Sequence, residues 1–122
     1  MPGRVYTVEE ANELLPHLAP ALVELREKYE RAALIRTKMA QLAAGNGWSE
    51  EREQWSQTLA RVSTLVERLA EWDVELKDVA TGLVDFPTVI EGRDAYLCWR
   101  LGEPEVAYWH FREDGFAGRK PL

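Results

Sequence analysis

Two runs of apolar residues with the same helical spacing constrain the fold of this chain most. In each run the apolar side chains recur at intervals of 4, 3, 4, 3, 3, 4 and 3 positions, which places them on one side of an α-helix. The first run is Leu18, Leu22, Leu25, Tyr29, Ala32, Ile35, Met39 and Leu42; the second is Trp55, Leu59, Val62, Val66, Leu69, Trp72, Leu76 and Val79. Because "GNG" at 45–47 stops the first run, the pattern predicts an antiparallel helical hairpin.

The first arm begins with a recognisable capping sequence. Thr7 and Glu10, three positions apart, predict a capping box and therefore the start of a short N-terminal helix. Pro16 and Pro20 lack an amide hydrogen and disfavour helix in the residue before them. We therefore expect the short helix to end or kink near Leu15, where the long arm follows.

Gly82 is expected to end the second arm, so the helical hairpin occupies residues 1–82. Two helices that pack along one seam, as in a coiled coil, cover only one side of each other. Three large apolar residues fall outside the predicted seam and need another cover: Leu34, Trp48 and Leu65. The C-terminal segment or a second copy of the chain can supply that cover, and we expect a homodimer.

After the hairpin the hydrophobic period changes to about two. The segments "LVDFPTVI", "AYLCWRL" and "EVAYWHF" are rich in β-branched and aromatic residues, and "EGRD" and "GEPE" separate them as turns. They predict a three-stranded antiparallel β-meander over residues 83–111, in which Pro87 marks an edge or a bulge. Residues 112–122 carry two glycines and no period, which indicates an ordered loop or arm. The predicted fold is one α+β domain of residues 1–122.

Length and composition exclude several classes of function. A chain of 122 residues is about one domain long, and 15 Lys and Arg against 21 Asp and Glu leave a net charge of −6. Since neither half concentrates basic residues, nucleic acid is not expected as a main partner. One cysteine cannot form an internal disulfide and no signal peptide opens the chain, so we expect a cytoplasmic protein. No apolar run approaches the roughly 20 residues that a membrane span needs.

His110 is the first candidate for chemistry, because imidazole titrates near neutrality and is the commonest metal ligand. If "GEPE" forms a four-residue turn, His110 lies opposite Leu97, on the face that carries Trp99 and Tyr108. A turn one residue different reverses that assignment. His110 is either a structural histidine that is hydrogen-bonded among aromatic rings, or a group for metal binding or proton transfer.

A divalent metal site would use His110 with Glu103 and Asp85 as carboxylate ligands. Glu113 and Asp114 are further acidic candidates. No HxH, HExxH or CxxC spacing supports the site, and the lone cysteine is an outside choice as a ligand. That cysteine, Cys98, is expected to pack as a small apolar residue.

The segment "GFAGRK" indicates a different kind of site. Backbone amides at Gly115 and Gly118, with the Arg119 guanidinium beside them, can bind a small anion. The alternative is an arm that docks on the chain or on a partner subunit, with Phe116 as its apolar anchor and Arg119 paired to a carboxylate.

Arg100 and Asp85 also have two interpretations. They can pair across neighbouring strands and fix the register of the sheet. Alternatively, they line a small-molecule pocket whose aromatic walls are formed by Tyr96, Trp99, Tyr108 and Trp109.

Two parts of the chain resemble a prokaryotic family known as domain-of-unknown-function family 2203. They are the C-terminal 41 residues, with the motifs "CWRLGE", "YWH" and "GFAGR", and the segment "YTVEEANELLP" near the start. The resemblance implies no activity. An acidic residue often follows the histidine of "YWH" in that family, whereas Phe111 stands there in this chain.

These observations leave two hypotheses of function open. The first is a dimeric, non-catalytic module whose sheet and arm bind a small anionic ligand or a protein partner. The residues expected to carry it are Asp85, Arg100, Glu103, Tyr108, His110 and Arg119. The alternative is a metal-binding protein or small enzyme in which His110 acts with Glu103 and Asp85. Covalent catalysis is least favoured, since no serine or threonine follows Thr88.

Overall fold

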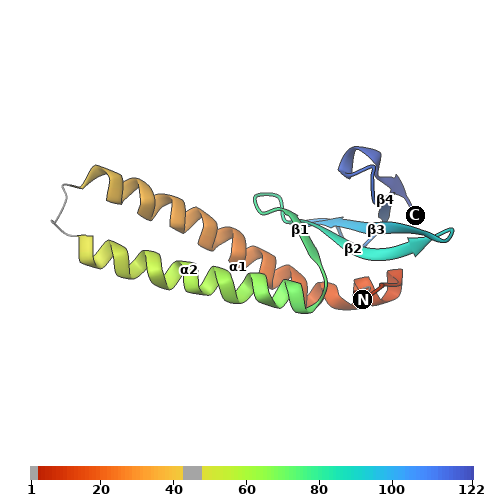
Figure 1. Ribbon diagram of the computed structural model, residues 1–122, viewed down its shortest axis with the longest axis horizontal. Helices are drawn as coiled ribbons and strands as arrows, with labels where there is room; N and C mark the ends of the chain where they lie inside the picture. The colour runs from red at the N-terminus through yellow and green to blue at the C-terminus, as the bar shows by residue number, and fades with distance from the viewer. Residues whose placement is uncertain (1–2, 43–47) are drawn as a thin grey trace.

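The computed structural model describes residues 3–42 and 48–122; the predicted "GNG" turn at 45–47 and the side chain of Trp48 lie outside the described residues. A long helical hairpin carries a five-stranded sheet at one end, beside the first turns of α1 (Figure 1). The elements are α1 Val8–Gln41, α2 Trp48–Glu71, β1 Glu75–Asp78, β2 Leu83–Ile90, β3 Arg93–Arg100, β4 Tyr108–Phe111, the 3-10 helix η1 Phe116–Gly118 and β5 Lys120–Pro121. The predicted α+β fold is confirmed.

Helix α1 starts as predicted but continues through both prolines. The Glu10 amide donates to Thr7 Oγ1 at 3.1 Å, and the Thr7 amide donates to Glu10 Oε1 at 2.9 Å, which completes the capping box. Pro16 and Pro20 lie inside the helix and are exposed, so the prediction of a separate short helix ending near Leu15 is wrong. The helix therefore continues although each proline lacks the amide hydrogen that would bond to the carbonyl four positions earlier.

The seam between the two helices agrees only in part with the stripe predicted on α2. Leu69 of that stripe is 2% exposed and Val62 packs against the core, but the buried side is otherwise rotated from the predicted one. Leu65, which was placed outside the seam, is fully buried, and Thr58 and Glu51 are buried on the same side. Leu59 and Val66, which were placed in the seam, are 41% and 43% exposed. The predicted stripe on α1 is largely correct, with four members buried: Leu18, Leu22, Leu25 and Ile35.

Ion pairs across the hairpin explain this rotation of α2. Two nitrogens of the Arg61 guanidinium donate to the Glu24 carboxylate at 2.6 and 2.7 Å. Lys38 pairs with the buried Glu51 at 3.1 Å. Charged heads at these positions are stabilised by facing the other arm, so apolar spacing alone does not determine which side of α2 is buried.

The second arm ends earlier than predicted. Helix α2 ends at Glu71, and Asp73 has a positive φ of 57°, a conformation that a continuing helix does not allow. The chain then turns into β1, in which Leu76 is paired with Val84 of β2. The prediction that the hairpin extends to Gly82 is wrong, because Leu76 fits both a helical stripe and a strand.

The sheet has five antiparallel strands in the order β1-β2-β3-β4-β5, rather than three. The two additional strands are β1, which was assigned to the helix, and β5, which was assigned to the C-terminal arm. At Gly82 the backbone has a φ of 66°, and an added Cβ would lie 2.5 Å from the Leu101 side chain. Only glycine therefore fits the entry into β2.

The two faces of the sheet have different covers. One face packs against α1, the end of α2 and the extended residues before α1, and its side chains join the main core: Val84, Phe86, Leu97, Trp99 and Trp109. Tyr6 joins this core, with its ring 5.1 Å from Phe86 and its amide donating to the Pro87 carbonyl at 2.7 Å. The residues after β4 lie on the opposite side of the sheet from α1 (Figure 1). The second face is therefore covered by the C-terminal arm.

Candidate metal centre

The register of the sheet brings three chemically reactive side chains together under the arm. Asp85 on β2 is directly opposite Cys98 on β3, and His110 on β4 is opposite Tyr96, two residues before Cys98. Since side chains alternate along a strand, all of these lie on the face turned away from the helices. Asp85, Cys98 and His110 are 3%, 1% and 2% exposed.

The ligand atoms of the three residues converge. A carboxylate oxygen of Asp85, Sγ of Cys98 and a ring nitrogen of His110 all lie within 4.8 Å of one another. Nε2 of His110 is 3.1 Å from Oδ2 of Asp85, and Nδ1 is 2.8 Å from the Phe111 carbonyl oxygen. A carbonyl can only accept, so Nδ1 carries a hydrogen and donates it. Nε2 is therefore the nitrogen that faces the cluster.

The contact between His110 and Asp85 requires a positive charge or a shared proton. With Nδ1–H committed to the carbonyl, the short contact between His110 and Asp85 needs one proton between Nε2 and Oδ2, or a cation in its place. Burial raises the pKa of the Asp85 carboxyl above its usual value, while the neighbouring His110 opposes that rise. Burial, together with the nearby Asp85 charge, raises the pKa of the Cys98 thiol to about 12.

Asp85 also has an unsatisfied atom. Its Oδ1 is buried and has no hydrogen-bond partner among the described residues. The thiol of Cys98 lies beside the carboxylate but is only a weak donor. A buried acceptor without a partner is costly, by roughly 1–3 kcal/mol. The orphaned oxygen belongs to the same carboxylate whose other oxygen contacts His110.

An ion pair fixes the arm over this face. Nη2 of Arg119 donates to both oxygens of Glu103, at 2.9 and 3.0 Å, and the two side chains are only 12% and 18% exposed. The Arg119 guanidinium lies 4.0 Å from the centre of the Tyr108 ring and 4.8 Å from that of Phe116. Gly118 allows the tight turn of the arm, since an added Cβ would lie 2.6 Å from Cβ of Asp114.

A cavity of about 180 Å³ lies between the cluster and the arm. Asp85, Cys98 and His110 line one part of it. The rest of its lining is formed by Lys77, Leu83, Tyr96, Arg112, Gly115 and Phe116. The three buried groups are thus in contact with a space large enough for a small ligand.

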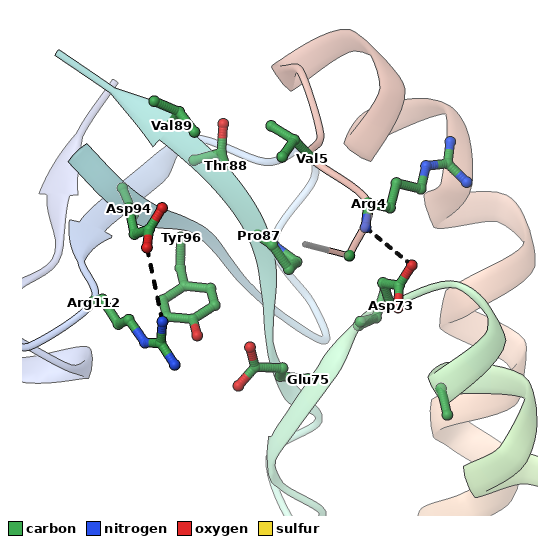
Figure 2. A pocket seen from close by; sticks show the side chains of 14 residues that line it. Arg4, Val5, Asp73, Glu75, Pro87, Thr88, Val89, Asp94, Tyr96 and Arg112 are labelled. Carbon is green, nitrogen blue, oxygen red and sulfur yellow. Dashed lines mark hydrogen bonds and ion pairs between the residues drawn. The ribbon is translucent and has the colours of Figure 1, made fainter. Parts of the chain in front are cut away.

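A larger cavity, of about 530 Å³, lies on the other side of Tyr96. It is lined by residues of β1, β2 and β3 and by the residues before α1. Figure 2 shows the Tyr96 ring between Glu75 and Arg112, with Asp94 beside that arginine. Arg112 and Tyr96 line both cavities. Burial and a hydrogen bond with Glu75 raise the pKa of Tyr96 to about 12, so this wall of the cluster is a neutral phenol.

The structure separates the six residues predicted as a ligand site into two groups and leaves Arg100 outside both. Asp85 and His110 meet in the cluster. Glu103, Arg119 and Tyr108 form the contact that holds the arm. Arg100 is exposed, and its guanidinium lies 5.9 Å from the Phe116 ring.

The predicted metal ligands are separated in the same way. Glu103 is paired with Arg119 and is not part of the buried cluster, in which Cys98 stands with Asp85 and His110. The predicted pairing of Asp85 with Arg100 across the strands is not observed either, because the residue opposite Asp85 is Cys98.

Three residues at the site were not among the main candidates from the sequence. Cys98 was expected to pack as a small apolar residue and was only an outside choice as a ligand; its position opposite Asp85 becomes evident once the register is known. Lys77 and Arg112 were not among the candidates. Lys77 lies on β1, a strand that was predicted as helix, and Arg112 follows β4 directly.

Over residues 4–122 the sequence matches the profile of a family described as "Uncharacterized conserved protein (DUF2203)". The chain belongs to this family. No match was found to a curated protein or to a solved structure. All three clustered residues fall within the DUF2203 match, so the centre is built from the family's own region of the chain. Neither helix of this DUF2203 protein has, in its described part, a stretch long and apolar enough to cross a membrane.

Proposed function

We propose that the protein binds a divalent transition metal ion of the zinc type, through the Asp85 carboxylate, the Cys98 thiolate and Nε2 of His110. The observation that carries this proposal is the convergence of three different ligand groups, from three neighbouring strands, within 4.8 Å. The proposal keeps the sheet and the arm as the functional surface and favours the metal-binding alternative. The homodimer and the cytoplasmic location stay predictions, and metal binding does not depend on them.

The ligand set suits zinc. Zn²⁺ accepts sulfur, imidazole nitrogen and carboxylate oxygen as ligands. At metal–ligand bond lengths of roughly 2.1 Å, a nitrogen and an oxygen bound to the same tetrahedral ion lie about 3.4 Å apart. The observed distance between Nε2 of His110 and Oδ2 of Asp85 is 3.1 Å. The Nδ1–H bond to the Phe111 carbonyl resembles the outer contacts that orient metal-bound histidines.

Charge balance supports the same ion. A divalent cation, one carboxylate, one thiolate and a neutral imidazole have a net charge of zero. A neutral assembly avoids most of the free energy lost when a single charge is buried. The high pKa of the Cys98 thiol, about 12, applies to the cluster without a cation, since a bound metal deprotonates a coordinating thiol.

The unpartnered oxygen of Asp85 is a second, independent observation. The Asp85 side chain is 4% exposed, and its Oδ1 has no partner among the described residues. In a purely structural pair with His110, the further hydrogen-bond donor to this carboxylate is the Cys98 thiol, which is a weak donor. A metal ion next to the carboxylate satisfies it electrostatically or by direct coordination.

Cobalt titration tests the proposal. Co²⁺ bound tetrahedrally with a thiolate ligand gives visible d–d bands and a sulfur-to-metal charge-transfer band. We expect these bands to saturate at one Co²⁺ per chain, to lose the charge-transfer band in Cys98→Ser, and to be absent in His110→Ala. His17→Ala is the matched control, because His17 is exposed and far from the cluster in the chain.

The opposite result would identify the cluster as structural. Co²⁺ that gives no saturable spectrum with the folded wild-type protein removes the metal proposal. A spectrum that survives in Cys98→Ser and His110→Ala, but is lost in His17→Ala, places the metal elsewhere. Circular dichroism of each variant separates a lost ligand from a lost fold.

A further inference from the structure

Three protein ligands leave one position of a tetrahedral ion open, which is the arrangement found in metal sites that bind an exchangeable ligand. The cavity of about 180 Å³ includes Asp85, Cys98 and His110 in its lining, so a small ligand in this cavity would reach an ion held by these three residues. We infer that the open position takes a small monocarboxylate, held by Lys77 and Arg112. This inference rests on the proposed metal site.

Two cations at the cavity supply the charge for such a ligand. Lys77 and Arg112 both line it, and both are exposed on their outer side. Lys77 pairs with Glu75 at 2.9 Å, and Arg112 reaches Asp94 only at 3.8 Å. Exposed ion pairs of this kind contribute about 0–1 kcal/mol, so each cation can exchange its protein carboxylate for one on a ligand.

Arg119, which belongs to the arm, is not available in the same way. Arg119 is already bound by two hydrogen bonds to Glu103 and packs on the Tyr108 ring. The arm therefore closes the cavity, while Arg112, just after β4, supplies the forked guanidinium that matches a carboxylate. We therefore place the anion at Arg112, whereas the sequence pattern indicated Arg119.

The remaining walls favour a ligand with an apolar part. Leu83, Phe116 and the Tyr96 ring line the cavity around the charged groups. A volume of about 180 Å³ corresponds to about six water molecules at roughly 30 Å³ each. It accommodates a carboxylic acid with a short carbon chain, whose carboxylate contacts the metal and whose chain contacts the apolar wall. Inorganic phosphate would leave that wall without a partner.

Propionate added to the Co²⁺-loaded protein tests this inference. We expect propionate to change the d–d bands in a saturable manner, because a new ligand alters the cobalt geometry. Arg112→Gln and Lys77→Gln should each weaken propionate binding by about tenfold, the effect of one charge-assisted hydrogen bond, and should leave the Co²⁺ affinity unchanged. Arg93→Gln is the matched control, since Arg93 is exposed on β3 and pairs with Glu113.

The outcomes separate the two proposals. No Co²⁺ spectrum at all removes the metal site, and with it this inference. A normal Co²⁺ spectrum that propionate does not change leaves the metal site intact and removes the inference. Propionate binding that is as tight in the Arg112 and Lys77 variants as in the wild type, or weaker than binding of inorganic phosphate, also overturns it.

Discussion

Replacing Asp85 by asparagine should have opposite effects on stability with and without metal. In the metal-free protein the side-chain amide introduced by Asp85→Asn can donate to Nε2 of His110, while Nδ1 still donates to the Phe111 carbonyl, which lies 2.8 Å away. A neutral amide replaces a buried carboxylate with one unsatisfied oxygen. The introduced amide keeps a hydrogen bond to His110 and removes the free-energy cost of burying a charge at this position. We expect the melting temperature of metal-free Asp85→Asn to equal or exceed that of the wild type.

With zinc present, the wild type should have a higher melting temperature than Asp85→Asn. At a free Zn²⁺ concentration about one hundred times the dissociation constant, a ligand that binds only the folded state stabilises it by about 2.7 kcal/mol. For a chain of this length each kcal/mol raises the melting temperature by about 4 °C, so the wild type should gain about 10 °C. Asp85→Asn loses its charged ligand and should gain less than about 2 °C under the same conditions.

Thermal unfolding followed by tryptophan fluorescence, in chelator and in buffered Zn²⁺, measures both effects. His17→Ala, which changes the exposed histidine, should behave as the wild type does. A metal-free Asp85→Asn protein destabilised by about 3 kcal/mol or more would refute the reasoning, because breaking a needed buried pair has an effect of that size. Equal zinc shifts in wild type and variant would do the same.

Three further predictions concern the hairpin. Thr7→Ala should lower the free energy of unfolding by about 1 kcal/mol, measured in urea, because it removes the capping oxygen. Hydrogen bonds from Thr7 lower the pKa of Glu10, so the contribution of this carboxylate is present above its unfolded pKa and is lost as the pH falls through the lowered value; Glu10→Gln should flatten that acid limb. Leu59 and Val66 lie seven residues apart and half-exposed on α2, and we expect them to contact a second copy, so Leu59→Glu with Val66→Glu should convert a dimer to a monomer in sedimentation. A wild type that sediments as a monomer at high concentration would show the dimer prediction to be wrong.

The sequence predicts the type of each element better than the side that it buries. The change from a hydrophobic period near 3.6 to a period near two identifies the hairpin and the sheet. The spacing of apolar residues determines which backbone conformation can place them on one continuous buried face. On α2 the same spacing misleads: Leu59 is 41% exposed, whereas Leu65 is fully buried. The Arg61–Glu24 pair, 37 positions apart in the chain, orients α2 and leaves no trace in the apolar pattern.

The register of β3 and β4 shows a second limit. A four-residue turn at "GEPE" would place His110 opposite Leu97, yet His110 is opposite Tyr96, one position away. The wider loop is held by α1, since the Val106 amide donates to Oδ1 of Asn12 at 2.7 Å. A contact between residues 94 positions apart thus stabilises the loop that accompanies the observed register of β4.

This one-residue difference in register determines which side chains surround His110. In the register with Leu97 opposite His110, the imidazole would lie on the face of Trp99, within the apolar core against α1. In the observed register His110 meets Asp85 and Cys98 under the arm, where a cavity reaches all three. The aromatic residues of the tail therefore serve two separate surfaces. Trp99 and Trp109 pack toward the helices, while Tyr96 and Phe116 line the cavity beside the buried ligand groups and Tyr108 packs against Arg119. A substitution that shifts this register by one residue should remove the metal site while leaving the strand count intact, which links the predicted function to one loop contact rather than to the composition of the sheet.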